Sequence, residues 1–419
     1  MTDESHPGTH GPLHGLQVLD MTTVQMGPLA TAILADLGAD VIKIESPEGD
    51  ISRNSLPTRS PGMGHSFLMI NRNKRAITLD LKASEGKSAL LALAKKADIF
   101  VSNVRPQAMA RLKLDYDDLK AVNPKIIYVG AFGFSQRGRY AARPAYDLAL
   151  QGMAGLPWMS QRASGQAPRY APHSYVDQTS ALHVVIGVLS ALHHRSATGR
   201  GQRVHVPMFE NLVHVLLGEH LAAEAFIPPA GPVGYDKQMT EDRRPYATKD
   251  GYICPFIYND KQWRIFLAAI GQPSKFDEDS RFSSHRNRLA NFRFVNGFLS
   301  DVLQTRTTEE WKELLTNYDL PFGPMNSLED VLRDPHLADT NYFRSMNHPT
   351  EGPLRYMTYP TEFSETPPSV RRHAPHRGEH TVEVLEEAGY DRQSIDDLVQ
   401  KGVAITAGHD VGTMVTEGK

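Results

Sequence analysis

A carboxylate stands in an otherwise apolar, helix-like run, "RPAYDLALQG", at residues 143–152. The carboxylate belongs to Asp147, whose neighbours Leu148 and Leu150 would suit a buried helix. Aspartate is a poor residue for the interior of such a helix because its side chain competes for backbone hydrogen bonds. Asp147 therefore either caps the helix or lies at the edge of a pocket, where it takes part in chemistry.

Two clusters of basic residues could also bind a ligand. Arg72, Lys74 and Arg75 come directly before one predicted strand, and Arg105 and Arg111 follow another. Basic side chains at strand ends can hold a ligand that carries several phosphates. The alternative is an ordinary solvated face.

These residues lie among alternating strands and helices. Short apolar runs predict strands, and amphipathic runs with Pro or Gly at their ends predict helices. Strand, helix and strand with short connections imply right-handed crossovers and a mostly parallel α/β sheet, whose ligands bind beyond the carboxyl ends of the strands. Strands are expected at 16–21, 41–46, 75–82, 98–103 and 124–134, and helices at 27–40, 84–97, 106–114 and 177–194.

The first strand–helix–strand unit, at 16–46, imitates a dinucleotide-binding fold because it ends in Glu45. Its turn, "DMTTVQMGP", has no GxGxxG, and the chain has no GxxxxGK[ST]. The close backbone approach to a pyrophosphate is therefore missing, which argues against a nicotinamide or flavin dehydrogenase.

Composition excludes several other classes. The 419 residues are 40% hydrophobic and 22% charged, with a net charge of −3, so a nucleic-acid-binding surface is not expected. No apolar run reaches the roughly 20 residues that span a bilayer. The single cysteine, Cys254, cannot form an intramolecular disulfide or a thiolate metal cluster, and it suits the reducing cytoplasm. We expect it to be buried in a strand.

Length and composition shifts predict more than one domain. We expect a mobile tail at 1–14, a linker at 211–239 and a small domain at 240–339. The large domain would combine 15–210 with 340–419, and its stretch at 340–376 is expected to be Pro-rich and extended.

Several segments together resemble a known family. They are "LQVLDMTTVQMGPLATAILADLGADVIKIESPEGD", "NRNKRAITLDLK", "ADIFVSNVRPQAMARL", "NPKIIYVGAFGFSQRGRYAARPAYDLALQGMAGL", "TGRGQRVHVPMFE", "RPYATKDGYI" and "APHRGEHT". In this order they resemble the class III coenzyme A (CoA) transferases, also called the CaiB/BaiF or formyl-CoA transferase-like family. The resemblance covers nearly the whole chain.

The resemblance implies an acyl-CoA:carboxylate CoA-transferase in which Asp147 is the nucleophile. An aspartate is ionised at neutral pH and needs no partner base. It would form an acyl anhydride and then an aspartyl-CoA thioester, with Gln25 donating to the oxyanion. The implied substrates are an acyl-CoA and a small carboxylic acid, and the implied fold is an interlocked homodimer with a Rossmann-like large domain and a smaller α+β domain. No metal or prosthetic group is implied.

The resemblance also implies where CoA is held. Val104 and Leu112 would cover the apolar face of the adenine. In the formyl-CoA transferases a lysine stands where this chain has Phe132, so one contact is expected to be missing. The implied CoA-binding residues are Val24, Met26, Arg72, Lys74, Arg75, Asn103, Val104, Arg105, Arg111 and Leu112.

The acceptor acid is less defined by the sequence. Formyl-CoA:oxalate transferases carry a glycine run that this chain lacks, which puts oxalate and formate in doubt. Tyr146, Arg169 and Tyr170 are candidate acceptor-binding residues, and an arginine there could hold the second carboxylate of a dicarboxylic acid such as succinate. A solvated basic loop is the alternative.

Two other functions stay open. The α-methylacyl-CoA racemases of this family have a histidine before the aspartate, where this chain has Tyr146, a poor base. Their second acid matches Asp177, which would equally serve as the N-cap of the helix at 177–194. A CoA-binding protein without catalysis is the other alternative.

Overall fold

The computed structural model describes residues 11–408, and the chain forms two compact units. The first unit contains the chain up to Ala154, then Ala171–Leu216, and the chain from Asn341 onward. The second unit contains Gly155–Tyr170 and Leu217–Thr340. The chain therefore leaves the first unit twice and returns to it each time.

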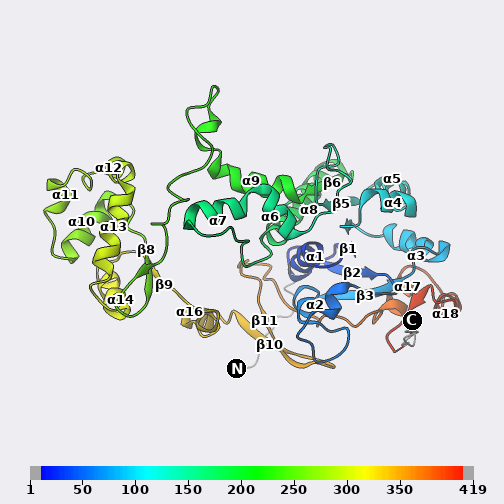
Figure 1. Cartoon of the computed structure of the whole chain (residues 1–419). Helices are drawn as coiled ribbons and strands as arrows, with labels where there is room; N and C mark the ends of the chain where they lie inside the picture. Colours follow the sequence, from blue (N-terminus) through cyan, green and yellow to red (C-terminus); the bar gives the residue numbers. More distant parts are fainter. Residues whose placement is uncertain (1–10, 409–419) are drawn as a thin grey trace, which may run out of the picture. The chain divides into compact units, whose positions relative to one another are not determined.

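A seven-stranded sheet organises the first unit (Figure 1). Its order is β12-β3-β2-β1-β4-β5-β6; only β12 is antiparallel to its neighbour. The direction of winding reverses between β1 and β4, and such a switch point opens a crevice at the carboxyl ends of the strands. The strands are β1 (Gln17–Met21), β2 (Asp40–Glu45), β3 (Lys74–Leu79), β4 (Ile99–Ser102), β5 (Ile127–Phe132), β6 (Arg203–Pro207) and β12 (Ala404–Ile405).

Helices cover both faces of this sheet, which is why its central strands are buried along most of their length, including the polar residues Asp20 and Lys43. The crossover helices α1 (Met26–Asp36) and α8 (Tyr175–Thr198) pack against each other on one face. Leu19, Phe100 and their neighbours build the core under the other face. The helices there are α3 (Ser84–Ala94), α4 (Pro106–Leu112), α5 (Tyr116–Val122), α17 (Thr381–Glu387) and α18 (Arg392–Gln400).

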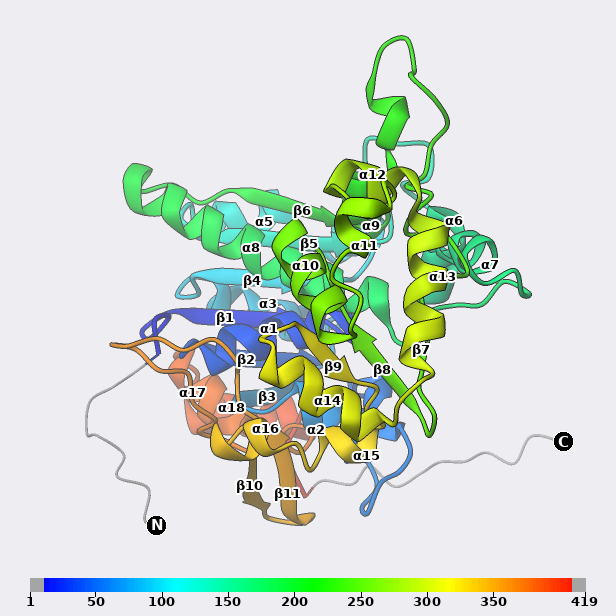
Figure 2. The same ribbon diagram turned by 90° about the vertical axis from the view of Figure 1, so that its left-hand side faces the viewer.

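Shorter elements complete the first unit. The strands β10 and β11 pair as an antiparallel hairpin (Figure 2). Helix α9 starts in the first unit and continues into the second. The remaining elements are η1 (Ile51–Asn54), α2 (His65–Ile70), α6 (Asp147–Ala154), α9 (Met208–His220), β10 (Phe343–His348) and β11 (Gly352–Met357).

Helix α8 is long and apolar enough, by length and composition alone, to cross a membrane. In the fold it is a crossover helix that packs on α1, β5 and β6. Leu182, Ile186 and Leu189 face away from that packing and are 52%, 57% and 40% exposed. They follow the helical repeat and form one apolar stripe, here called the α8 stripe.

The second unit has its own core of aromatic side chains, including Trp263, Phe266, Phe282 and Trp311. A three-stranded antiparallel sheet, β7-β8-β9, lies with several short helices in this unit (Figure 2). Its elements are α7 (Leu156–Ser164), η2 (Ala222–Ala225), β7 (Tyr246–Ala247), β8 (Tyr252–Pro255), α10 (Asp260–Ala269), α11 (Lys275–Glu278), α12 (His285–Ala290), α13 (Phe292–Leu303), α14 (Thr308–Asn317), β9 (Phe322–Pro324), α15 (Leu328–Val331) and α16 (Pro335–Asp339).

Three expectations from the sequence are wrong in their details. Residues 1–10 of the predicted tail lie outside the described residues, but Leu13 is buried and its N–H donates to the Leu37 carbonyl at 2.9 Å. The predicted linker at 211–239 contains most of α9 and all of η2. The stretch at 340–376 is extended as expected, but two of its segments pair as the unforeseen β10–β11 hairpin. Cys254 is exposed.

Candidate active site

The switch point of the sheet is held together by one amide side chain. Asn103, directly after β4, donates from Nδ2 to the Thr23 carbonyl at 2.9 Å and accepts the Thr23 N–H at Oδ1 at 3.1 Å. It therefore ties the loop after β4 to the loop after β1. The sequence predicted Asn103 as a CoA contact; its side chain is engaged in shaping the crevice.

The loop after β1 is strained. Val24 has φ +73°, which is a real cost for a β-branched residue. Its N–H donates to Asp50 Oδ1 at 3.1 Å, and Asp50 Oδ2 accepts the Lys43 ammonium at 2.8 Å. Burial by itself would raise the pKa of Asp50, but the Lys43 charge together with hydrogen bonds from Lys43 and Ser52 lowers it below its usual value, so the carboxylate stays ionised. A buried ion pair thus holds the turn that presents Gln25.

Gln25 immediately precedes helix α1 at the carboxyl edge of the sheet. Its Oε1 accepts the Ser66 hydroxyl at 3.1 Å, which leaves Nε2 as the end that can donate to a ligand. Met26 is buried and starts α1. Gly27 packs so closely on Thr22 that an added Cβ would lie 2.4 Å from the Thr22 Cβ. The turn therefore fixes Gln25 tightly.

Asp147 lies at the same edge. Gly133 follows β5, and a Cβ at Gly133 would lie 2.2 Å from the Ala145 side chain, so the segment before Asp147 presses on the end of this strand. Asp147 Oδ1 accepts Gln151 Nε2 at 2.6 Å. Its Oδ2 accepts the backbone N–H groups of Val176 and Asp177 at 2.8 and 3.1 Å.

The Asp147 carboxylate therefore caps α8, whose first N–H groups have no partner within the helix. The cap is made to α8 and not to α6, the helix of the "RPAYD" run itself, so the expected cap role is wrong in its helix, and a part in the chemistry stays a prediction for Asp147. Leu150 is fully buried beneath it, whereas Leu148 is 52% exposed, so the run is only half apolar core.

Asp177 is the second acid at this point. The expected N-cap role is wrong, because α8 begins at Tyr175 after Ser174 and Asp177 lies within its first turn. Burial raises the pKa of Asp177 to about 6, and the negative charge of Asp147 adds to the effect. The site thus holds two neighbouring carboxylates, one held by three donors and one with a perturbed pKa.

A cavity of about 320 Å³ opens beyond the carboxyl ends of β1, β2 and β3. Val104 and Leu112, the predicted adenine cover, line it together with Leu79 and Leu81. Its polar lining includes Ser46, Lys82 and the carboxylates of Glu45, Glu48, Asp50 and Asp80, of which Glu45 and Asp50 are paired with buried cations. An apolar slot with a few polar groups suits a nucleotide base.

Basic side chains stand close to this cavity in the chain. Arg105 and Arg111 are exposed at the two ends of α4, the helix that also carries Leu112. This arrangement can meet phosphates. Phe132 ends β5, is 9% exposed and packs edge-on against His205, so it offers no charge there.

The structure contradicts the predicted CoA contacts of Arg72, Lys74 and Arg75. Strand β3 begins at Lys74, so the cluster starts at the amino edge of the sheet, opposite the crevice. Lys74 is fully buried and donates to Asp20 at 2.9 Å; burial lowers its pKa to about 8, although Asp20 opposes that change.

The two arginines of this cluster are also engaged. Arg72 pairs with Asp36. Arg75 pairs with Asp40 at 2.6 Å and with Glu387 at 2.7 Å. These three basic side chains therefore neutralise acidic side chains of the same chain, a role that their spacing in the sequence does not indicate.

The residues predicted to bind the acceptor acid belong to different units of the chain. Tyr146 is 73% exposed beside Asp147 in the first unit. Arg169 and Tyr170 are exposed and belong to the second unit. Their contact with an acceptor stays a prediction.

The sequence analysis missed Gln151 and Lys82. Gln151 is fully buried one helical turn after Asp147; besides its bond to that carboxylate, its Oε1 accepts the Ala171 N–H at 3.0 Å. The Asp-x-x-x-Gln spacing was the available signal. Lys82 follows β3 at the carboxyl edge of the sheet. It ends the segment "NRNKRAITLDLK", of which only the basic residues at the start were predicted to bind CoA.

Comparison with known proteins defines the class. Residues 13–381 match the model of CoA-transferase family III, so the chain belongs to this family and is an enzyme. It is 33% identical to formyl-CoA:oxalate CoA-transferase of Streptomyces coelicolor, over 93% of this chain and 98% of that protein. It is 29% identical to human succinyl-CoA:glutarate CoA-transferase, over 94% of this chain and 90% of that protein.

A solved structure agrees with the fold. The crystal structure of Rv3272 from Mycobacterium tuberculosis superposes with a TM-score of 0.78 at 30% identity, over 89% of this chain and 99% of that one. The family resemblance is thereby confirmed, together with the α/β fold and its mostly parallel sheet.

Proposed function

We propose that the protein moves CoA from an acyl-CoA to a carboxylic acid through covalent aspartyl intermediates, and that Asp177 is the attacking carboxylate. This choice rests on the different surroundings of the Asp147 and Asp177 carboxylates. Both oxygens of Asp147 are occupied by Gln151 and by the amides of α8. Asp177 is half-buried, and loss of hydration makes a carboxylate a stronger nucleophile. This revises the expectation that Asp147 attacks.

The steps balance without a metal, ATP or redox group. The Asp177 carboxylate attacks the thioester carbonyl, the C–S bond breaks, and a mixed anhydride and CoA thiolate form. The thiolate attacks the aspartyl carbonyl of the anhydride and releases the donor acid as its carboxylate. The acceptor carboxylate then attacks the aspartyl thioester, and the returning thiolate takes the acceptor's acyl group and frees Asp177.

Gln25 is proposed to stabilise the oxyanions that form in these steps. Its Nε2 is oriented because Oε1 is held by Ser66. The cavity lined by Val104, Leu112 and Lys82 is proposed to hold the adenine, and Arg105 and Arg111 the phosphates. The names of the two relatives, which act on oxalate and glutarate, support a carboxylic acid as acceptor. Dicarboxylic and monocarboxylic acids therefore both belong in the first panel, and contact of the acceptor with Tyr146, Arg169 and Tyr170 stays a prediction.

We also propose that the active form is a homodimer in the cytoplasm. The α8 stripe supports a dimer, because exposed aliphatic side chains in register on one helix need a partner surface. The single cysteine, unpaired and exposed, suits a reducing compartment.

Mass spectrometry of the whole protein with an acyl-CoA and an acid panel tests the function. Transfer predicts a new acyl-CoA. Hydroxylamine added during turnover should convert the acylated aspartate to a hydroxamate, and trypsin separates the two candidates into peptides 140–162 and 170–195. Modification of 170–195 supports Asp177, whereas modification of 140–162 restores Asp147. Deuterium uptake next to the thioester without transfer would instead establish the racemase alternative.

A further inference from the structure

The second unit contains a cavity that the proposed transfer chemistry has not used. Its volume is about 410 Å³, within the range of small-molecule sites. It lies between the end of β8, the segment before β7 and the helices α12 and α13. Every residue that lines it belongs to the second unit.

One wall of this cavity is aromatic and exposed. Phe256 and Tyr258 stack with ring centroids 5.5 Å apart, and His285 packs edge-on against Tyr258 at 5.0 Å. The two stacked rings are 56% and 55% exposed although they face a cavity. Trp263 and Phe292 extend the apolar lining. Flat rings exposed in this way favour a flat apolar ligand.

The charge that lines the cavity has one sign. Lys237, Arg243 and Arg244 line it, and no aspartate or glutamate is among its lining residues. The Arg288 charge, also in the lining, is already balanced by Asp260. The three other cations offer a positive field to an anion that enters, and one of them, Arg244, also lines the neighbouring cavity that contains Asp242 and Asp301.

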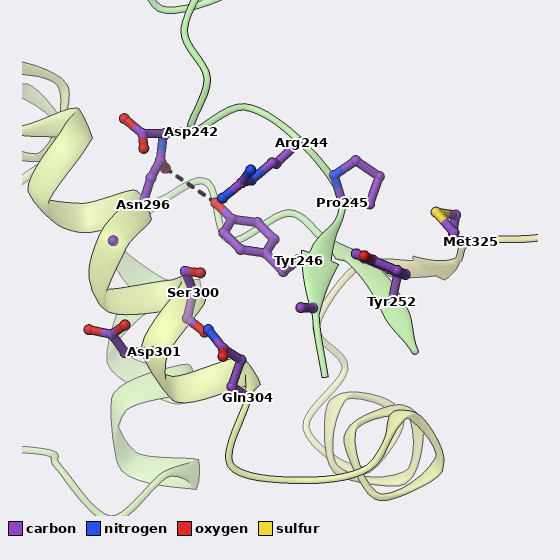
Figure 3. A pocket seen from close by; sticks show the side chains of 12 residues that line it. Asp242, Arg244, Pro245, Tyr246, Tyr252, Asn296, Ser300, Asp301, Gln304 and Met325 are labelled. Carbon is purple, nitrogen blue, oxygen red and sulfur yellow. Dashed lines mark hydrogen bonds between the residues drawn. The ribbon is translucent and has the colours of Figure 1, made fainter. Parts of the chain in front are cut away.

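A neighbouring polar cavity restricts where an anion can bind (Figure 3). Tyr246 lines both cavities, and its hydroxyl donates to Asn296 Oδ1 at 3.3 Å. Asp242 and Asp301 line only the polar cavity, where they would repel a carboxylate. Figure 3 shows Arg244 beside the Tyr246 ring. An acid is thus favoured on the aromatic side alone.

We propose that this aromatic cavity binds the free acid of the exchange, and that this acid carries one carboxylate on an aromatic or other bulky apolar body. The acid rather than the acyl-CoA is assigned because the phosphates and adenine of CoA are already assigned to Arg105, Arg111 and the cavity beside β3, and the thioester carbonyl itself is neutral. The role of this acid as CoA acceptor rests on the proposed function, whereas its binding does not.

Titration calorimetry on the full chain without CoA tests the assignment, with 2-naphthoate and glutarate as probes. The double variant Arg243→Gln/Arg244→Gln and the single variant Phe256→Ala should each weaken naphthoate binding by about tenfold or more. Arg264→Gln is the matched control, because Arg264 is an exposed arginine of the same unit outside the cavity lining. Equal melting temperatures of the variants would show that the unit stays folded.

The outcomes separate the two proposals. Tighter binding of naphthoate than glutarate, lost in both cavity variants and kept in Arg264→Gln, supports the assignment, as does a raised KM for naphthoate with an unchanged KM for the acyl-CoA. Absent binding, equal binding by all variants, a preference for glutarate, or unchanged naphthoate kinetics in the variants overturns it. The proposed function fails on a different result, namely no thioester formed with any acid of the panel.

Discussion

Asp147 accepts the backbone N–H of Asp177 through Oδ2 at 3.1 Å, so one aspartate caps the helix turn that carries the other. The same carboxylate fixes Gln151, and the helix dipole of α8 stabilises its negative charge. That charge, together with burial, raises the pKa of Asp177 to about 6. The two acids thus have different states because one is surrounded by donors and the other is not.

The first prediction concerns activity and its pH dependence. Asp177→Asn should lower kcat by about 10⁴-fold or more, because the nucleophile is lost. An ionised Asp177 is required, so wild-type activity should rise with pH through about 6 and then level off. Asp147→Asn removes the neighbouring charge and should move this acidic limb to lower pH. A pH profile of kcat/KM for the wild type and for Asp147→Asn checks this, and an unmoved limb in Asp147→Asn contradicts the coupling.

The second prediction concerns stability. The pKa of Asp177 is raised in the folded state from 3.8 to about 6, so the folded protein binds the proton more tightly. Stability from this group is present below pH 4 and is lost as pH rises to 6, by about 3 kcal/mol. Asp177→Asn does not titrate and should melt higher than wild type at pH 8 by several degrees. Thermal melts from pH 4 to 8 check it; a constant difference across that range argues against the assigned cause.

The fold could largely be predicted because most strands of the large sheet contain short apolar runs that are buried. The run at 16–21 and the helix after it match β1 and α1 closely. The β10–β11 hairpin was missed because its strands are half exposed and carry polar residues, which gives no apolar run to detect. Strand β12 has only two residues, too few for a pattern.

The site could be predicted less well, because residue type does not say what a charge is paired with. Lys74 begins β3 and Lys82 lies in the segment after its end at Leu79, yet the two lysines look alike in the sequence. Only the fold shows that Lys74 forms an ion pair with Asp20, whereas Lys82 lines the cavity. Val104 and Leu112, which the family resemblance implied, do line the cavity, and their contact with the adenine stays a prediction.

The third prediction tests the close contact behind Asp147. Gly133→Ala puts a methyl group 2.2 Å from Ala145, so the segment that leads to Asp147 must move and kcat should fall by about 10-fold or more. Gly138→Ala in the same loop meets only the Ser135 carbonyl, at 3.7 Å, and should leave activity unchanged. Steady-state kinetics of both variants decide the matter, and equal activity would show that the contact is unimportant.

The fourth prediction concerns Gln25. Gln25→Ala removes the proposed oxyanion donor and should lower kcat by about 10²–10³-fold with little change in the KM of the acyl-CoA. Ser66→Ala removes only the hydroxyl that orients this amide, so its loss should be smaller, about threefold to tenfold. If Gln25→Ala raises KM and keeps kcat, then the side chain binds the ground state and is no oxyanion donor.

The last prediction concerns the α8 stripe. Ile186 is 57% exposed between Leu182 and Leu189, so a homodimer would bury it at the centre of an apolar contact. Ile186→Glu places a charge there and should dissociate the dimer, because burial of an unpaired carboxylate costs more than the apolar contact returns. His194→Glu introduces the same charge near the end of α8, off the stripe, and should leave the assembly intact. Analytical ultracentrifugation of the three proteins distinguishes the cases. Dimers of unchanged affinity in Ile186→Glu, or monomers in the wild type, would show that another surface or none forms the assembly.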